Sequence, residues 1–399
     1  MKKPELLAPA GDLERLKIAL DYGADAVYIG GLFNLRANTP NFKLEELKEA
    51  VEYAHKNNKK VYVTVNNVMH NKELDKLEDY LKELKKIKVD AIIVSDPAVI
   101  KYAFSLKLPV HLSTQASTLN KKAVKFWEEE GIERIVLARE CTKEDIKEIK
   151  ESTNIEIETF IHGAMCASFS GRCVLSNYLT NRDSNRGGCS QICRWDFDFY
   201  KEDKILKGEK PFTFCTKDLS LAKYIPDIIN LEVDSLKIEG RMRSAYYIAT
   251  VVKTYRKIID EYIKDKENYK FKKEYQKILD DVANRDSIPQ FFDGNYGKEV
   301  QYYNGRKEIT NQDFIGLVLD YDEKTKLAKV EQRNYFKKGD NIEVFGPNKE
   351  VKMKIKDIYD EEMNKIDIVR HPKQIVYIKI DKKVEKNYMI KCIDKSNNV

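Results

Sequence analysis

The chain has 399 residues, of which 42% are apolar and 34% carry a charge. That apolar fraction supports a large packed core and excludes a globally disordered protein. The net charge of +6 is small beside 71 basic and 65 acidic side chains, so it permits a nucleic-acid partner without arguing for one.

The start of the chain and its hydropathy argue against export and against membrane insertion. The first residues, MKKPELLAPAG, lack an apolar stretch of signal-peptide length, and no run of about 18 apolar residues occurs anywhere. We therefore expect a cytoplasmic protein with no membrane partner. In that reducing compartment the seven cysteines are expected to be metal ligands or buried thiols rather than disulfides.

The first part of the chain alternates short β-branched runs with amphipathic helical patterns. This alternation predicts a parallel sheet, and eight repeats suit a closed (β/α)₈ TIM-like barrel of about 250 residues better than an open sheet. The number of strands alone leaves an open doubly wound sheet as the alternative. The eight predicted strands cover residues 6–8, 26–29, 61–66, 91–95, 110–114, 134–138, 155–161 and 235–239.

Composition and periodicity divide the chain into three parts. Residues 1–285 form the predicted α/β barrel, and a long insertion at 162–233, before the eighth strand, carries five of the seven cysteines. Residues 286–312 have the composition of a linker. In residues 313–399 apolar side chains recur at every second position in six stretches separated by turn residues, which predicts a small antiparallel β-barrel domain.

The alternation of side chains along barrel strands predicts which of them face the interior. Lys237 and Glu239 are predicted to point inward from the eighth strand. In the seventh strand Glu156, Glu158 and His162 share the inward face. Burying charges without partners costs several kcal/mol each, so these residues need mutual pairing, a ligand or both.

Active sites of this fold lie at the C-terminal mouth of the barrel. Some of the polar residues expected there could be structural, for instance as an ion-pair layer of Lys237 with Glu239, but the lining of a site is favoured for the group as a whole. The residues predicted at the mouth are Asn66, Gln115, Arg139, Glu140, His162, Lys237, Glu239 and Arg241.

Cys166, Cys173, Cys189 and Cys193 form the pattern C-x₆-C-x₁₅-C-x₃-C. Four thiolates complete the ligand shell of a [4Fe–4S] cluster, and they equally suit tetrahedral zinc. The pattern lacks the tight C-x₂-C knuckles that are usual in structural zinc sites, which favours iron–sulfur. Four unrelated thiols are a poor explanation, because the four cysteines fall within 28 residues.

Other residues of this insertion allow further interpretations. Arg172 and the neighbouring arginines could offset the negative charge of a thiolate-bound cluster, or they could hold phosphates. Cys215 is close enough in sequence to be a spare ligand. His162 could instead activate Cys166 as a nucleophile, with proximity in sequence as the only support. The chain has no HExxH or GxSxG hydrolase signature.

Taken together, the motifs of the chain resemble peptidase family U32, once described as collagenase-like proteases. The resemblance spans about residues 4–261, and the β domain suits the C-terminal module of that family. The matching stretches are LLAPAGD (6–12), YGADAVYIGG (22–31), LRANTPNF (35–42), VTVNNVMHN (63–71), LSTQAS (112–117), LARE (137–140), FIHGAMCASFSGRC (160–173), GGCSQICRW (187–195) and DSLKIEGRMRSAYYIATVVKTYRKIID (234–260).

The resemblance implies an RNA-modifying oxidoreductase. It is nearest to the branch of the family that converts the wobble uridine of tRNA to 5-hydroxyuridine, with prephenate as co-substrate and with help from the iron–sulfur assembly machinery. It also implies that Cys166, Cys173, Cys189 and Cys193 carry the [4Fe–4S] cluster. The alternative is a peptidase that hydrolyses peptide bonds, as the family name suggests.

The predicted roles follow from charge and position. The inward cations are expected to hold carboxylates or phosphates, the glutamates and the histidine are candidates for proton transfer, and the Lys-rich C-terminal domain would hold the RNA backbone. The expected catalytic residues are His162, Lys237, Glu239, Arg139 and Glu140, and the expected substrate-binding residues are Asn66, Gln115, Arg241 and Arg172.

Overall fold

The structure is a computed structural model, and it describes residues 2–35, 41–206, 211–294, 297–302 and 313–393. The chain divides into two compact units, Met1–Glu308 and Ile309–Val399. The last part of the predicted linker, residues 303–312, lies outside the described residues.

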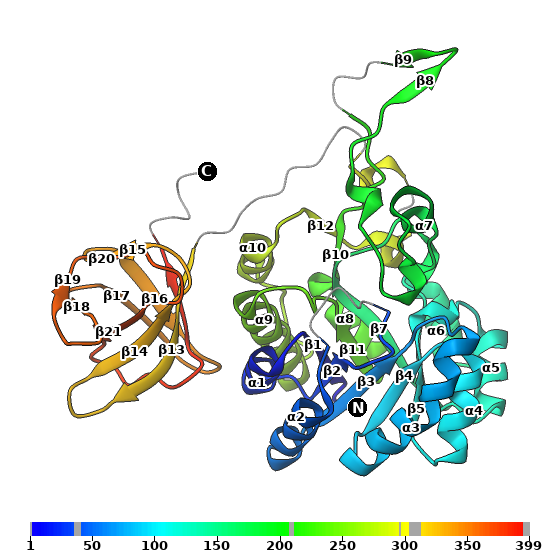
Figure 1. Cartoon of the computed structure of the whole chain (residues 1–399), viewed down its shortest axis with the longest axis horizontal. Helices are drawn as coiled ribbons and strands as arrows, with labels where there is room; N and C mark the ends of the chain where they lie inside the picture. The colour runs from blue at the N-terminus through cyan, green and yellow to red at the C-terminus, as the bar shows by residue number, and fades with distance from the viewer. Residues whose placement is uncertain (1, 36–40, 207–210, 295–296, 303–312, 394–399) are drawn as a thin grey trace. The chain divides into compact units, whose positions relative to one another are not determined.

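The first unit is a closed parallel β-barrel with helices packed around it (Figure 1). The barrel closes because β11 pairs in parallel with both β1 and β7. The predicted (β/α)₈ barrel is therefore confirmed, and an open sheet is excluded. Its strands are β1 (Glu5–Ala10), β2 (Ala26–Gly30), β3 (Lys60–Val65), β4 (Ala91–Val94), β5 (Val110–Leu112), β6 (Arg134–Val136), β7 (Glu156–Gly163) and β11 (Ser235–Ile238).

The helices around the barrel bury apolar residues against it, and α1, α4, α5, α6 and α9 begin at capping side chains. Asp12, for example, accepts a hydrogen bond from the backbone N–H of Arg15 at the start of α1. No helix in the described ranges is long and apolar enough to cross a membrane. The helices are α1 (Leu13–Asp21), α2 (Leu44–Lys56), α3 (Asn71–Ile87), α4 (Pro97–Ser105), α5 (Lys121–Glu129), α6 (Lys143–Lys150), α8 (Ile225–Asn230), α9 (Ala245–Lys264) and α10 (Lys273–Val282).

A network of ion pairs lies in the barrel interior. The Arg134 guanidinium is 2.5 Å from Glu5, 2.6 Å from Glu156 and 3.2 Å from Glu158. Lys237 Nζ lies 2.8 Å from the other carboxylate oxygen of Glu158, whose side chain is fully buried. The expectation that the buried charges pair with one another is thus confirmed, and the pairs join β1, β6, β7 and β11.

A β-bulge in β7 changes which residues face the barrel interior. Lys237 pairs with Phe160, whereas the next residue of β11, Ile238, pairs with His162. Successive side chains of a strand point to opposite faces, so one extra residue reverses the alternation. Phe160 precedes the bulge and contacts Lys237 inside the barrel, whereas His162 follows it and contacts Tyr255 of α9. The prediction that His162 points inward is wrong for this reason.

The cysteine-bearing insertion leaves the end of β7 and returns through α8 to β11. Near its return, β10 pairs antiparallel with the end of β7 and parallel with β12. The insertion contains η2 (Phe169–Gly171), α7 (Leu175–Thr180), η3 (Ser184–Arg186), η4 (Ile192–Arg194), β8 (Phe199–Lys201), β9 (Lys204–Leu206), β10 (Asp218–Ser220) and η5 (Ala222–Tyr224).

The first part of the predicted linker belongs to the barrel unit. β12 (Ser287–Ile288) extends the sheet beside β10, and Arg285 Nη2 lies 2.6 Å from Asp218. Two short helical turns follow, η6 (Gln290–Asp293) and η7 (Lys298–Val300). The prediction of a linker from residue 286 is wrong here, because buried pairing to the insertion overrides the polar, loop-like composition of the segment.

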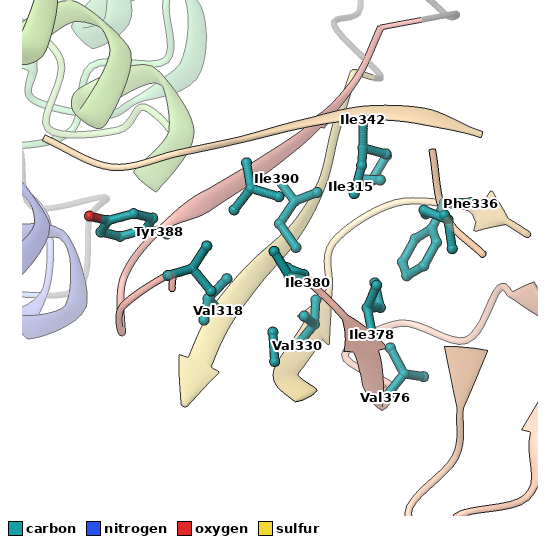
Figure 2. Packing of buried hydrophobic residues seen from close by; sticks show 14 of the residues in the cluster. Ile315, Val318, Val330, Phe336, Ile342, Val376, Ile378, Ile380, Tyr388 and Ile390 are labelled. Atoms are coloured by element: carbon teal, nitrogen blue, oxygen red, sulfur yellow. The ribbon is translucent and has the colours of Figure 1, made fainter. Parts of the chain in front are cut away.

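The second unit is an antiparallel sheet that curls around one apolar core, as predicted (Figure 2). Ile315, Val330 and Ile378 are among the fully buried residues at its centre. The strand order is β17-β16-β22-β13-β14-β21-β18-β19, and β15 pairs with β20. The strands are β13 (Phe314–Asp322), β14 (Leu327–Gln332), β15 (Phe336–Lys337), β16 (Asn341–Phe345), β17 (Glu350–Lys354), β18 (Ile358–Tyr359), β19 (Lys365–Ile366), β20 (Ile368–Val369), β21 (Ile375–Lys379) and β22 (Met389–Cys392).

Candidate active site

A small polar cavity of about 60 Å³, here called the mouth cavity, lies at the C-terminal ends of the barrel strands. This is the end of the barrel at which enzymes of this fold hold their substrates. The predicted site residues that line it are Asn66, Gln115, Arg139, Lys237, Glu239 and Arg241.

The mouth cavity has an excess of positive charge. Arg139 Nη2 lies 3.1 Å from Glu239, and Arg241 Nη1 donates to the amide oxygen of Asn34 at 2.6 Å. The ammonium group of Lys237 bonds to the buried Glu158 beneath it. Three cations therefore line the cavity with one carboxylate among them. Such an arrangement favours an anionic ligand, because each cation can add a charge-assisted hydrogen bond.

Gly30 leaves the space that the Arg241 guanidinium occupies. A Cβ atom built at Gly30 would lie within 2.6 Å of three guanidinium atoms of Arg241. The side chain of Arg241 is buried, and its position depends on the absence of a side chain at Gly30. The glycine at the end of β2 thus places one of the three cations of the mouth cavity.

The four predicted ligand cysteines line a second cavity of about 320 Å³, here called the cysteine cavity. The predicted spacing therefore does bring Cys166, Cys173, Cys189 and Cys193 together around one space. The two cavities meet, because they share four lining residues: Leu35, Thr114, Gln115 and Arg139.

The thiols of the cysteine cavity lie in a polar surrounding. The backbone N–H of Leu175 donates to Cys173 Sγ at 3.4 Å, and Cys166 Sγ lies 3.1 Å from the hydroxyl of Ser168. Burial, together with the nearby thiol of Cys166, raises the pKa of Cys193 to about 11. In the described residues no three His, Cys, Asp or Glu side chains converge closely enough to hold a single metal ion.

Three other residues of the prediction lie around the cysteine cavity. Arg172 lines it, outside the mouth cavity. Glu140 lines neither cavity, and instead its carboxylate accepts hydrogen bonds from the backbone N–H and the hydroxyl of Ser170, both at 2.7 Å. Glu140 is therefore a positioning residue for η2. Cys215 is buried outside the lining, with its sulfur 3.9 Å from Arg285 Nη1.

Comparison with known protein families identifies both units. Residues 11–302 match peptidase family U32, and residues 310–391 match the C-terminal domain of peptidase family U32. The chain belongs to peptidase family U32.

Three relatives of this U32 chain match it over most of its length. The tRNA hydroxylation protein P1 of Bacillus subtilis is 53% identical over 98% of this chain and 95% of its own length. An uncharacterised protease of Methanocaldococcus jannaschii is 39% identical over 86% of both chains. The tRNA hydroxylation protein P of Haemophilus influenzae is 31% identical over 97% of this chain and 95% of its own.

His162, a predicted catalytic residue of the U32 chain, lies outside both cavities. Its ring packs against Tyr247 and Tyr255 of α9, and its Nδ1 is 3.2 Å from the Tyr255 hydroxyl. Burial, helped by the charge of Arg243, lowers the pKa of His162 to about 3. A buried, neutral imidazole that faces a helix does not activate Cys166, so the proposed histidine–cysteine pair is wrong.

Acid is expected to destabilise the barrel unit below about pH 6.5 because of two buried histidines. Burial lowers the pKa of both His162 and His111 to about 3. In the unfolded chain a histidine has a pKa of about 6.5, so between these values only the unfolded chain binds the proton. The free energy of unfolding should therefore fall by about 1.4 kcal/mol per pH unit for each histidine.

Urea unfolding between about pH 6 and 5, followed by tryptophan fluorescence, measures this slope. Both tryptophans, Trp127 and Trp195, lie in the barrel unit, so the signal reports on that unit alone. The matched variant is His162→Phe, which should lose about half of the slope. If the free energy of unfolding depended equally on pH in the variant and in the wild type, the slope would not come from His162.

Tyr28, Asn34 and Phe160 are among the cavity residues that are absent from the sequence prediction. The Phe160 ring lies 3.9 Å from the guanidinium carbon of Arg139, and the Tyr28 ring lies 4.6 Å from Lys237 Nζ. Phe160 stands two positions after Glu158, so the alternation along β7 did carry a signal for it. Asn34 lies in the loop after β2, where no periodic pattern marks a direction.

Proposed function

We propose that this chain is an iron–sulfur-dependent RNA-modifying enzyme that hydroxylates the wobble uridine of tRNA at its 5-position, with prephenate as co-substrate. The observation that carries the proposal is the junction of the two cavities. A cavity with four cysteines adjoins a cationic barrel mouth, and the two share Leu35, Thr114, Gln115 and Arg139. One site can therefore hold a redox centre beside an anionic small molecule.

The relatives support RNA as the substrate. Two proteins that match the chain over almost its full length are named tRNA hydroxylation proteins. A further relative, from Escherichia coli, is named a 23S rRNA 5-hydroxycytidine synthase and is 35% identical over 66% of this chain. The name of this Escherichia coli relative and the reaction proposed here both specify hydroxylation of a pyrimidine base at its 5-position.

The donor set of the cysteine cavity fits a [4Fe–4S] cluster held by Cys166, Cys173, Cys189 and Cys193. The amide that donates to Cys173 Sγ also suits a thiolate ligand. Four thiolates equally suit tetrahedral zinc, and the content of iron, sulfide and zinc distinguishes the two. A bound cluster would supply electron transfer beside the barrel mouth. It implies iron–sulfur assembly proteins as partners.

The charges of the mouth cavity suit the carboxylate groups of a small dicarboxylate such as prephenate, while its volume of about 60 Å³ has room for one end of that molecule rather than the whole. Lys237, Arg139 and Arg241 supply three cations around one space, and each can form a charge-assisted hydrogen bond to a carboxylate oxygen. Asn66 and Gln115, whose amides contact each other at 3.3 Å, line the same cavity and would orient the ligand.

Glu239 is the proposed proton acceptor of the site. It is the one carboxylate among the residues that line the mouth cavity, and its side chain is 19% exposed. Arg139 holds one of its oxygens at 3.1 Å, which keeps the carboxylate pointing toward the junction of the two cavities. A carboxylate in this position can take a proton from the substrate or from a bound water.

A complementation experiment tests the proposed function. The gene for this chain is expressed in a bacterial strain that lacks 5-hydroxyuridine in its tRNA, and the nucleosides are measured by mass spectrometry. We expect the wild type to restore the modification, and Lys237→Ala to restore none of it. Absence of the modification with well-folded, cluster-loaded wild-type protein would refute the proposal.

Gly30→Ala is expected to lower hydroxylation at least about tenfold with little loss of stability, because the new methyl group displaces the Arg241 guanidinium. Loss of one charge-assisted hydrogen bond costs roughly 1.5–3 kcal/mol, which corresponds to a tenfold or larger change in binding. The measurement is the KM for prephenate. In the double variant Gly30→Ala/Arg241→Ala the loss should equal that of Arg241→Ala alone, whereas additive losses would contradict the mechanism.

Peptide hydrolysis is a second candidate function, because the relative from Methanocaldococcus jannaschii is named a protease. The position of His162 removes the base that was expected beside Cys166. A fluorogenic peptide assay on homogeneous protein tests this candidate. Hydrolysis that is lost in Cys166→Ser, but is independent of any cluster, would favour it over hydroxylation.

A further inference from the structure

We propose that the exposed side of the cysteine-bearing insertion binds single-stranded RNA, with bases stacking on Tyr178. This surface, here called the arginine–aromatic face, consists of Phe169, Arg172, Tyr178, Arg182 and Trp195. The inference rests on the proposed function, because it names the surface that would bring an RNA loop to the cysteine cavity.

The charge of the insertion suits a polyanion. Residues 166–195 contain four arginines and one aspartate, with no lysine and no glutamate. Elsewhere in the chain lysines far outnumber arginines, and acidic side chains nearly balance them. Arginine binds phosphate oxygens in a bidentate manner and stacks on bases, whereas lysine acts as a point charge. Arg172 and Arg182 of the face are both exposed.

The aromatic side chains of this face lie open to solvent. Tyr178 is 82% exposed, Phe169 is 51% exposed and Trp195 is 47% exposed. Each of these rings carries a large apolar area that the described part of the chain leaves uncovered. Exposed aromatics among arginines are typical of surfaces that bind single-stranded nucleic acid, where each stacked base contributes about 1–3 kcal/mol.

Tyr178 stands one helical turn from the rim of the cysteine cavity. Its backbone N–H donates to the carbonyl of Val174, and Val174 lines that cavity. Leu175, on the same helix, lines the cavity as well. A base stacked on Tyr178 would therefore leave the next nucleotide of the strand within reach of the cavity. Enzymes that modify a base need this step, because the target must leave its stack before it reacts.

The neighbouring hairpin β8–β9 provides an internal comparison. It projects away from the barrel (Figure 1), and Tyr200 on it is 64% exposed. Residues 199–206 of this hairpin contain two lysines and two acidic residues, so they lack the positive charge of residues 166–195. The arginine–aromatic face and the hairpin each carry an exposed tyrosine, but the net charge of the residues around the tyrosine differs. Tyr200 is therefore a matched control for Tyr178.

Fluorescence anisotropy with a labelled RNA stem-loop, and with a blunt duplex of the same stem, tests the proposal on the full chain. We expect tighter binding of the stem-loop than of the duplex. Tyr178→Ala should weaken binding of the stem-loop at least about fivefold, since it removes one stacked base. Tyr178→Phe and Tyr200→Ala should bind within about twofold of wild type, as aromaticity alone serves stacking. Arg182→Ala should lower the salt dependence of log Kd by about one unit.

Three results would overturn the arginine–aromatic face. The first is unchanged RNA binding in Tyr178→Ala, and the second is equal binding of stem-loop and duplex by the wild type. The third is a change of oligomeric state in Tyr178→Ala with RNA binding intact, which would make this surface a protein contact. In each case hydroxylation by the wild type can persist. Failure of the wild type to hydroxylate tRNA would instead overturn the proposed function, whatever the anisotropy shows.

Discussion

Replacing Cys173 with serine is expected to abolish both the visible absorption of the anaerobically purified protein and its hydroxylation of tRNA. Cys173 lines the cysteine cavity and accepts a hydrogen bond from the backbone N–H of Leu175. A serine hydroxyl is a poor ligand for iron, so three thiolates would remain for a cluster that requires four ligands. Iron and sulfide content, together with the absorption spectrum, measures the loss.

Two other cysteines provide the controls for this experiment. Cys392 is buried in β22 of the second unit, so Cys392→Ala should keep the full colour and the full iron content. Cys215 lies outside the lining of the cysteine cavity, beside Arg285, so Cys215→Ser should keep the cluster too. A colourless wild type that holds one zinc per chain would contradict the cluster. Loss of colour in Cys215→Ser would show that Cys215 is a ligand.

Replacing Glu158 with glutamine is expected to lower the free energy of unfolding of the barrel unit by about 3–5 kcal/mol. Glu158 is fully buried, and it lies 2.8 Å from Lys237 and 3.2 Å from Arg134. Arg134 keeps Glu5 and Glu156 as partners in the variant. In the part of the chain that the structure describes, Glu158 is the ion-pair partner of Lys237, so its loss leaves a buried ammonium group without a counter-charge.

Glu156→Gln is the matched control for Glu158→Gln. It stands on the same strand and pairs with the same arginine, but its side chain is 39% exposed. We expect it to lose under about 1 kcal/mol, as is usual for exposed ion pairs. Urea unfolding followed by tryptophan fluorescence measures both variants. Equal losses in the two would show that burial does not set the cost.

A compensating double variant separates stability from chemistry at this network. In Glu158→Leu/Lys237→Met both charges are removed, and apolar groups of similar size can take their place, so most of the stability should return. Hydroxylation should stay lost, because Lys237 lines the mouth cavity. Recovery of hydroxylation together with stability would mean that Lys237 has a structural role alone.

Protonation of Glu158 is expected to lower the free energy of unfolding of the barrel unit in a second, more acidic pH range. Burial by itself would raise the pKa of Glu158, but the charges of Lys237 and Arg134 outweigh it and bring the pKa down to about 2. The unfolded carboxyl has a pKa of about 4.3. The stabilisation is therefore complete above about pH 4.3 and is lost as the pH falls toward 2, a range that begins below pH 5, where the histidine slope is measured.

The sequence by itself determined the barrel, the order of its strands and the grouping of the cysteines. Residues 235–239 illustrate why, because alternation on a strand fixes the face of Lys237 once the helix-facing side is apolar. The four cysteines likewise fall within 28 residues that follow the end of the seventh strand, so the chain cannot carry them far from the mouth of the barrel. These features depend on local periodicity and on short separations along the chain.

Only the tertiary structure decided which predicted residues share the site. A one-residue bulge in β7, just after Phe160, turned His162 toward α9, and such a bulge arises from pairing with β11 rather than from a local pattern. Glu140 holds η2 through Ser170, a contact across thirty residues of chain. The two cavities share side chains from three separate segments of the barrel unit. Contacts between segments distant in sequence follow from packing, which a single sequence does not record.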